Sequence, residues 1–374
     1  MKRVLALTLA LVATAGTLEA QQDNQLTNDD PSLPTTRVGT RGAAFLNLPV
    51  GARAQSLGGA YTAMANDISS LYWNTAGIAQ IDGFAVGATS ARLFDDLDIN
   101  HLFVGAVMPM GLTRLGISVN VLSSGEIPWQ SETNPNASFG GEQDPLRTAF
   151  EWQGMAVGLH LARPITDRLA FGGAVKYVTE GISGAEANYV GVDLGTTFRT
   201  GLYGITLGAS LQNLGRSGNF EGTLLSQRID TGQPESNLAP FTRVLEIDAG
   251  TNSLEMPTVF RFSIMADLIG DATAMIAPNP DNALRVVWDL NDAIDTDLQT
   301  ALGLEYGFRE LAFVRAGKRW FNEAQIDHSF SRGASIGAGV NIPLGDVTRF
   351  RLDYAYTDMG DLQNVQVFTL DFMF

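Results

Sequence analysis

Apolar and polar residues alternate with a period of two along most of the chain after Gly83. Successive side chains of a β-strand point to opposite faces of the sheet, so this period predicts strands with one apolar and one polar face. The last segment shows the pattern clearly, because Thr369 and Asp371 alternate with an apolar row. That row consists of Phe368, Leu370, Phe372 and Phe374.

Alternating segments recur at regular intervals along the chain. Most are close to the roughly 9 to 11 residues that a strand needs to cross a membrane. We therefore expect an all-β fold, a transmembrane antiparallel β-barrel of about 14 strands. The predicted strands begin near Gly83, His101, Thr113, Phe150, Arg168, Ala187, Tyr203, Val259, Ala283, Asp297, Leu311, Ala334, Thr348 and Asn364.

The connections between these segments alternate between short and long, as they do in outer-membrane barrels, whose periplasmic turns are short. Long connections follow odd-numbered strands, notably 123–148 and 215–256. The segment 268–282 is an exception, since it is long but follows an even-numbered strand. Short turns follow the other even-numbered strands, at 109–112, 164–167, 200–202, 307–310 and 343–347.

The polar face of the strands favours a membrane barrel over a soluble β-sandwich. It carries Gly, Ser, Thr, Asn and isolated charges, whereas a solvated surface carries many Lys and Glu residues. We expect these charges to pair inside the lumen and to rigidify wall and plug; the alternative is that they line a polar conduit. The charges expected to form this network are Arg285, Asp289, Glu305, Arg315, Arg351 and Asp353.

The beginning of the chain is organised differently. A basic start, an apolar run and small residues up to Ala20 predict a cleaved signal peptide over residues 1–20. Residues 21–42 read as a flexible lead-in, and residues 43–82 as a partly helical plug or hatch at the periplasmic mouth. The barrel then occupies residues 83–374.

Composition excludes several classes of function. The net charge is −16 and the pI is about 4.5, so nucleic acid is not an expected partner. The chain has no cysteine, which excludes thiol catalysis and cysteine-ligated metals. Its three histidines, His101, His160 and His328, show no metal-ligand spacing, and we place His160 on the lumen face. We expect no enzymatic activity, no metal and no cofactor.

Two further features bear on the interior and the mouth of the barrel. The glycine-rich stretch 333–339 lies within a predicted strand, which argues against a nucleotide-binding loop. We interpret its small residues as lumen positions that make room for a plug. The long connection 215–256 carries apolar side chains among polar ones. It either folds over the mouth or contacts a protein cargo or a hydrophobic ligand.

The plug segment resembles the amino-terminal block of the PorV/PorQ family, relatives of the FadL-type 14-stranded outer-membrane transporters. The resemblance rests on residues 44–67 and on the motif that follows at residues 71–79, where Thr75 replaces the usual proline. Loss of that proline should soften the turn. The resemblance implies a plug whose motif residues are Gly58, Gly59, Trp73, Asn74, Ala76 and Gly77. The terminal row ending at Phe374 similarly resembles the signal that the barrel-assembly machinery recognises.

The PorV branch of the family implies a function in type IX protein secretion. The barrel would dock secreted proteins through their carboxy-terminal signal domain and would contact other secretion components. The alternative is a FadL-like transporter for the uptake of hydrophobic small molecules, which requires an apolar pocket between plug and wall and a lateral gap or kinked strand. Either function places the protein among the lipids of the outer membrane of a Gram-negative-type bacterium.

Overall fold

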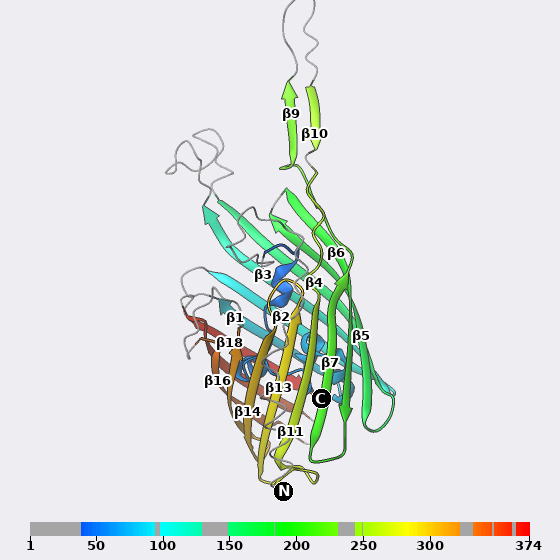
Figure 1. Ribbon diagram of the computed structural model, residues 1–374, viewed down its shortest axis with the longest axis vertical. Coiled ribbons are helices and arrows are strands. Elements are labelled where there is room, and N and C mark those ends of the chain that lie inside the picture. Colours follow the sequence, from blue (N-terminus) through cyan, green and yellow to red (C-terminus); the bar gives the residue numbers. More distant parts are fainter. Residues whose placement is uncertain are drawn as a thin grey trace, which may run out of the picture. The chain divides into compact units, whose positions relative to one another are not determined.

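The computed structural model describes residues 39–93, 98–128, 149–182, 184–230, 244–248, 250–321, 332–345, 348–360 and 364–374. Within them, one antiparallel sheet closes into a barrel, since β1 pairs with both β2 and β18, and β7 pairs with β11 (Figure 1). The sheet has 16 strands in these residues; β8 (Phe220–Glu221) and β12 (Ala277–Pro278) are two-residue additions, which leaves 14 in the wall. The predicted fold class is confirmed.

The wall strands begin within two residues of the predicted positions, and four begin at the predicted residue. They are β1 (Ala85–Leu93), β2 (Ile99–Met110), β3 (Thr113–Pro128), β4 (Ala149–Pro164), β5 (Leu169–Ile182), β6 (Ala185–Arg199), β7 (Ile205–Gly215), β11 (Val259–Gly270), β13 (Asn282–Ala293), β14 (Gln299–Phe308), β15 (Ala312–Trp320), β16 (Ala334–Pro343), β17 (Arg349–Asp358) and β18 (Asn364–Met373).

Strands β3 to β6 are longer than predicted. They contain 16, 16, 14 and 15 residues. Their additional length lies at the end of the barrel with the long connections. There β3 continues to Pro128 beyond its last register partner in β2, and β6 begins at Ala185, before its first register partner in β7 at Gly191. This part of the wall therefore extends beyond its neighbours at the end that we expect to be external.

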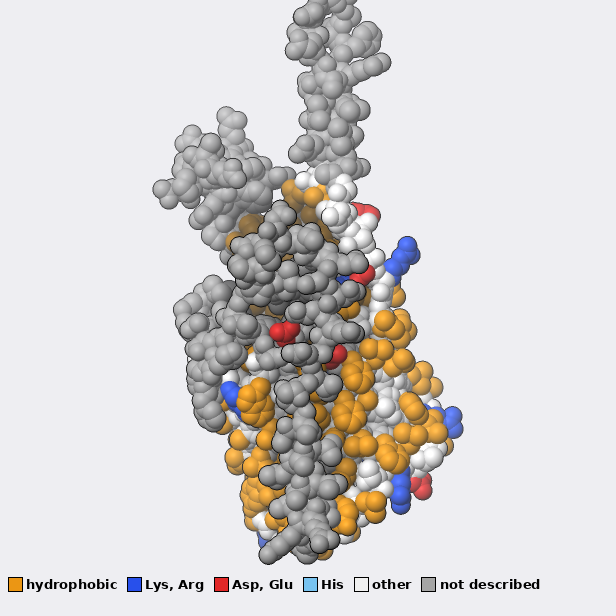
Figure 2. Space-filling view, in the orientation of Figure 1, with side chains coloured by type: hydrophobic (Ala, Val, Ile, Leu, Met, Phe, Trp, Pro, Cys, Tyr) orange, Lys and Arg blue, Asp and Glu red, His pale blue; other side chains and the backbone are white. Residues whose placement is uncertain are grey.

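Burial along each strand is the inverse of that in a soluble protein. In β14 the buried positions are Ala301, Gly303, Glu305 and Gly307, and the exposed positions between them carry Leu302, Leu304, Tyr306 and Phe308. Figure 2 shows hydrophobic side chains over much of the visible part of the described wall. The outer face therefore has the chemistry of a lipid-facing surface, and the polar face points inward.

The plug, residues 43–82, fills the interior of the barrel. Between Gly51 and Ile78 every residue except Asn66 is buried. Helix α2 contacts β15 to β18, whereas η3 contacts β3 to β6 on the other part of the wall. A segment that touches both parts of a closed wall lies in its lumen. The helical pieces are η2 (Ala44–Asn47), α2 (Ala52–Ser56), α3 (Ser70–Trp73) and η3 (Thr75–Gln80).

The long connections contain elements that the alternation did not predict. Residues 215–256 include β8 and a hairpin of β9 (Ser226–Asp230) and β10 (Val244–Asp248). The exceptional segment 268–282 contains the last residues of β11 and the whole of β12. Strand β12 pairs with β11 in parallel. No helix in the described ranges is long and apolar enough to cross a membrane. The predicted signal peptide and most of the lead-in, residues 1–38, lie outside the described residues.

Candidate functional site: the plug and the lumen wall

The motif around Asn74 holds the turns of the plug together. Asn74 Oδ1 accepts a hydrogen bond from the Ala76 amide at 3.2 Å and so caps η3. Its Nδ2 donates to the carbonyl oxygens of Thr62, at 2.9 Å, and of Thr196 in β6, at 3.0 Å. Trp73 Nε1 donates to the Val50 carbonyl at 2.7 Å. The side chain of Asn74 therefore links two turns of the plug to the wall.

The glycines of the motif allow close approach. A Cβ on Gly77 would lie 2.2 Å from the Ala65 carbonyl oxygen. Gly58 and Gly59 have φ of +69° and +85°, and a Cβ on Gly58 would lie 2.7 Å from the backbone nitrogen of Lys318 in β15. The left-handed backbone and the lack of space both favour glycine at these positions.

Thr75, which replaces the usual proline, has its own wall contact. Its Oγ1 lies 3.4 Å from His160 Nδ1, and His160 Nε2 lies 2.8 Å from Ser118 Oγ. All three side chains are buried. His160 is on the lumen face, as expected, and Thr75 makes a hydrogen bond that proline could not make.

Glu305 is the centre of the ion pairs that join plug and wall. Arg285 in β13 and Arg315 in β15 are both register partners of Glu305 in β14, so the three side chains form a row across three strands. Their nitrogens lie 3.0 Å and 2.6 Å from its carboxylate. Arg53 of the plug completes the cluster with two hydrogen bonds to Glu305, of 2.9 Å and 3.0 Å. A buried carboxylate with three cationic partners is well compensated.

The network continues to β17. Arg315 reaches Asp353 at 2.6 Å, passing Gly339 of β16, where a Cβ would collide with Asp353 Oδ1. Arg351 binds the other oxygen of Asp353 at 2.7 Å. It also lies 3.8 Å from Asp67 of the plug.

Arg53, Tyr61 and Asp67 form the plug side of this cluster. Tyr61 Oη donates to Asp67 at 2.5 Å, and Arg53 lies 3.5 Å from the same carboxylate. Burial alone would raise the pKa of Asp67, but Arg53 and Arg351, with hydrogen bonds from Ser69 and Tyr61, hold it below its usual value. Burial would lower the pKa of Arg53, but Glu305 holds it well above its ordinary value.

Asp289 differs from the other residues of the predicted network. Its carboxylate accepts hydrogen bonds from the backbone amides of Tyr61 and Thr62, at 3.1 Å and 2.9 Å, and from the hydroxyl of Ser263. It forms no ion pair with another described residue. Asp289 therefore fixes a turn of the plug by hydrogen bonds. The other five residues of the predicted network form ion pairs.

The carboxy-terminal row lies on the outer face, away from this interior. Phe368, Leu370, Phe372 and Phe374 are all exposed. The amide of Phe374 donates to the Phe84 carbonyl at 2.8 Å, beside the seam between β18 and β1. The recognition of this row by the assembly machinery stays a prediction.

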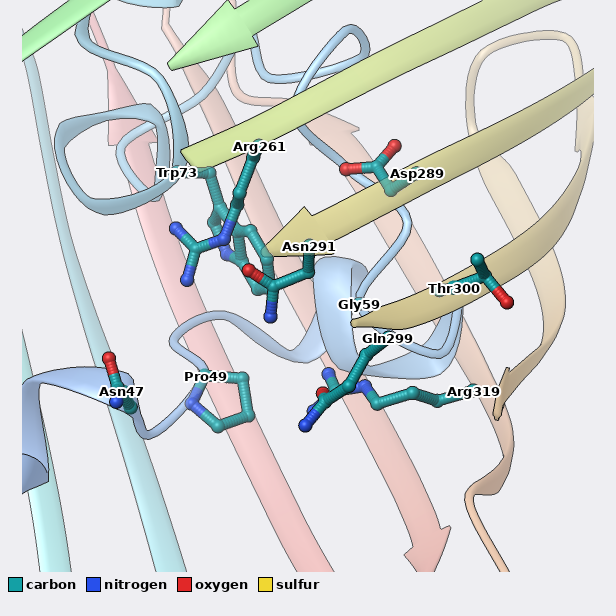
Figure 3. Close-up of a pocket in the computed structure, with 11 residues that line it drawn as sticks. Asn47, Pro49, Gly59, Trp73, Arg261, Asp289, Asn291, Gln299, Thr300 and Arg319 are labelled. Atoms are coloured by element: carbon teal, nitrogen blue, oxygen red, sulfur yellow. The ribbon is translucent and has the colours of Figure 1, made fainter. Parts of the chain in front are cut away.

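Two cavities lie between plug and wall. The first, of about 360 Å³ including space open to solvent, is lined by more polar than apolar residues and is drawn in Figure 3. The second, of about 350 Å³ on the same measure, has a mixed lining. Its apolar part is formed by Leu46, Leu71, Tyr72, Phe103 and Ala156, and its polar part by residues such as Ser118, Lys176 and Gln212. Both are narrow inside, with room for about one or two water molecules.

The residues that sequence reasoning missed belong mainly to the plug side. Arg53 and Asp67 lie within residues 44–67, which carry the resemblance, but the sequence does not identify them as ionic partners of the wall. A single Arg between Ala52 and Ala54, in a segment expected to be buried, is a usable signal, since buried charges need partners. Arg261 lies outside the predicted network, and its guanidinium lies over the ring of Trp73 at 4.8 Å.

Comparisons with known proteins agree with this architecture. A model of the uncharacterised protein family UPF0164 matches residues 35–217, which include the plug and the first seven wall strands. No curated protein matches the chain. Among solved structures, the chain is similar to the CymD monoaromatic hydrocarbon channel, with a TM-score of 0.53 and 11% identity over 87% of this chain and 96% of that one.

Two toluene transporters are also similar. TbuX of Ralstonia pickettii gives a TM-score of 0.51 at 11% identity, covering 87% of this chain and 98% of that one. TodX of Pseudomonas putida gives 0.50 at 12%, covering 86% and 95%. The chain is a β-barrel of the outer-membrane type. The expected likeness to FadL-type channels is thus confirmed for the fold, whereas the PorV/PorQ branch stays a prediction.

Proposed function

We propose that this barrel is an outer-membrane transporter that admits small hydrophobic molecules. The observation that carries the proposal is the mixed cavity between plug and wall, in a barrel with the fold of hydrocarbon channels. Leu71, Tyr72 and Phe103 supply its apolar surface. An apolar pocket with a few polar groups is the usual form of a small-molecule site. The sequence predicts this function as the alternative to the docking of secreted proteins.

A bulge in the wall lies beside this cavity. The register between β6 and β7 shifts between Val192 and Leu194. Asn213 in β7 has a φ of +57°, and its amide donates to Asp193 Oδ1 at 2.8 Å. Asn213 also lines the cavity. A bulge locally disrupts the strand ladder, so a molecule in this cavity would face a part of the wall where strand pairing is interrupted.

The narrow interior of the cavity means that passage requires the plug to move. Ile68 of the plug and Gly87 of β1 offer a way to prevent that movement, because a Cβ on Gly87 would lie 3.1 Å from Ile68 Cβ. This separation is a few tenths of an ångström below the roughly 3.5 to 4.5 Å of a disulfide. The same Cβ on Gly87 would lie 1.9 Å from Asp371 Oδ1, so the end of that side chain must turn away to admit the cysteine. The chain has no cysteine of its own, so the double variant Ile68→Cys/Gly87→Cys forms a single defined cross-link.

The test is uptake of radiolabelled toluene by cells that express the wild type, the double variant or either single variant. We expect uptake by the wild type and the single variants, little uptake by the oxidised double variant, and recovery after reduction. Wild-type uptake no greater than that of cells lacking the protein would overturn the proposal. Outer-membrane fractionation of the same cells checks that each variant reaches its location.

A second candidate function is docking of secreted proteins in type IX secretion, as the PorV-like resemblance implies. The observation that favours it is the extension of β3 to β6 beyond the rest of the wall at the expected external end, which offers a surface to a protein partner. Purification from outer membranes followed by mass spectrometry tests it. Secreted proteins with one shared carboxy-terminal domain would favour docking, and bound hydrophobic compounds without protein would favour uptake.

A further inference from the structure

The first cavity is lined by two arginines without a carboxylate partner, one buried and one partly buried. Arg261 in β11 and Arg319 in β15 both line it, and neither forms an ion pair with any described residue. Figure 3 draws both guanidinium groups beside the cavity, with Trp73 and Asn291 close by. The other interior arginines named above, Arg53, Arg285, Arg315 and Arg351, each bind at least one carboxylate, so this pair is an exception within the same lumen.

The charge of the cavity lining is positive in a strongly acidic protein. Two arginines contribute +2, and Asp289, the only acidic residue among the described lining residues, contributes −1, which leaves +1. The whole chain carries −16. The Asp289 carboxylate is already engaged by two plug amides and the Ser263 hydroxyl. It is therefore poorly placed to neutralise both arginines.

Unsatisfied polar atoms converge on the same cavity. Arg261 is 4% exposed, and its buried Nε has no hydrogen-bond partner. Asn47 and Asn291 also line this cavity. The Oδ1 atom of each is buried without a hydrogen-bond partner. Buried polar groups are nearly always paired. Of the three atoms, Arg261 Nε is the donor, so it is the one that an acceptor in the cavity would satisfy.

Neutral groups hold the Arg261 side chain in place. Its guanidinium lies over the rings of Trp73 at 4.8 Å and Tyr72 at 5.3 Å, and Nη1 donates to Gln212 Oε1. Arg319 Nε donates to the Gly58 carbonyl at 3.0 Å. Both side chains are fixed by neutral groups, which position the charges but do not neutralise them.

We propose that this cavity is an anion-binding site that takes a compact monoanion, a halide or a small carboxylate group. Water could satisfy the free hydrogen-bonding atoms, but only an anion also compensates the two guanidinium charges. The narrow interior excludes a bulky anion from full entry. Asn291 can turn its amide over with little change in shape and so present N–H donors to the anion. The proposal is independent of the proposed uptake function.

The first test uses the unmodified protein. Crystals of the full chain are soaked in bromide, and anomalous scattering locates the ions. We expect one strong peak between Arg261 and Arg319. Absence of a peak there, with ordered bromide elsewhere on the protein, would overturn the proposal.

The second test measures the melting temperature in detergent at constant ionic strength, with bromide, acetate or benzoate replacing a bulky sulfonate. We expect a saturable rise of about 2 °C for the wild type. Arg261→Gln should raise the half-saturating anion concentration about tenfold or more, since hydrogen bonds to charged groups are strong. The exposed Arg349→Gln is the matched control and should leave it unchanged.

The three anions distinguish the source of the charge. Stabilisation by bromide and acetate alone indicates a free compact ion, whereas stabilisation by benzoate as well indicates the acid group of a larger solute. If Arg261→Gln does not fold, Asn291→Ala keeps both charges and should still weaken binding. A linear, non-saturating rise that is equal in the wild type, the site variants and Arg349→Gln contradicts an anion site.

Discussion

Glu305 is the wall residue that binds Arg53 of the plug. Its buried carboxylate accepts from Arg53, Arg285 and Arg315. Glu305→Gln keeps the shape but leaves three guanidinium groups without their shared counter-charge. Because removing one partner of a buried ion pair is costly, we expect a loss of roughly 3–5 kcal/mol in the free energy of unfolding. Urea unfolding of the protein in lipid vesicles measures it.

Glu310→Gln is the matched control for that variant. Glu310 also binds Arg285, at 2.9 Å, but its side chain is 58% exposed. Solvent screens such a pair, so its loss should change the free energy of unfolding by about 0–1 kcal/mol. Equal losses in the two variants would show that burial of Glu305 contributes little.

The lowered pKa of Asp67 predicts how the stability of the protein changes at acidic pH. Its pKa is lowered in the folded protein, so its contribution to stability is present above the pKa of about 3.9 of an unfolded Asp and is lost as pH falls through the folded value. Between pH 7 and pH 5 this group should leave the melting temperature unchanged. Below about pH 4 the difference in melting temperature between wild type and Asp67→Asn should shrink. A difference that grows on acidification would contradict this sign.

The sequence identifies the charges of the wall better than their partners. Arg285, Glu305 and Arg315 could be assigned to the lumen from alternation alone. That they form one row depends on the register between strands, which alternation does not fix to the residue. Arg53 pairs with Glu305 across 252 residues of sequence, and no local pattern carries that contact.

At the scale of the elements, Gly317 of β15 shows how tightly plug and wall meet. A Cβ there would lie 2.0 Å from the carbonyl carbon of Leu57, a backbone atom that cannot rotate away. Gly317→Ala should therefore push α2 from the wall and cost roughly 1–3 kcal/mol. A Ser56→Cys reporter, the only cysteine in such a chain, should become more reactive towards a maleimide.

Gly250→Ala provides the control for this variant. Nothing lies within 4 Å of a Cβ at Gly250, and its backbone is not in the left-handed region. The reporter should react at the wild-type rate in that background. Equal rates in both backgrounds would mean that the wall yields at Gly317 without moving the plug.

The strand positions were predictable because each strand presents one face to lipid and one to the lumen. Apolar and polar residues therefore alternate with a period of two. The hairpin of β9 and β10 was not predicted. Its strands have five residues each and belong to a separate two-stranded sheet, so the wall does not impose its pattern on them. The extra length of β3 to β6 was missed for a similar reason, since strand ends beyond the apolar band need not alternate.

At the scale of the whole molecule, the apolar outer face predicts where charge is tolerated. Leu304 lies mid-strand on the outer face of β14. An arginine there would face hydrocarbon, so Leu304→Arg should cost roughly 2–4 kcal/mol if the band is lipid-facing. Leu344 is similarly exposed but follows the end of β16, so Leu344→Arg should cost about 0–1 kcal/mol. Urea titration in vesicles compares them, and equal costs would argue against a membrane band.

The contact between Arg53 and Glu305 also sets an order of events during synthesis. The plug leaves the ribosome early, whereas β14 follows 252 residues later. Until then Arg53 lacks its main counter-charge, and the apolar side chains of the plug, such as Leu57 and Leu71, have no wall to cover them. The newly made plug therefore exposes apolar side chains and an unpaired charge, and it must be kept from aggregating while the wall is completed. A holding chaperone that binds residues 43–82 would meet this need.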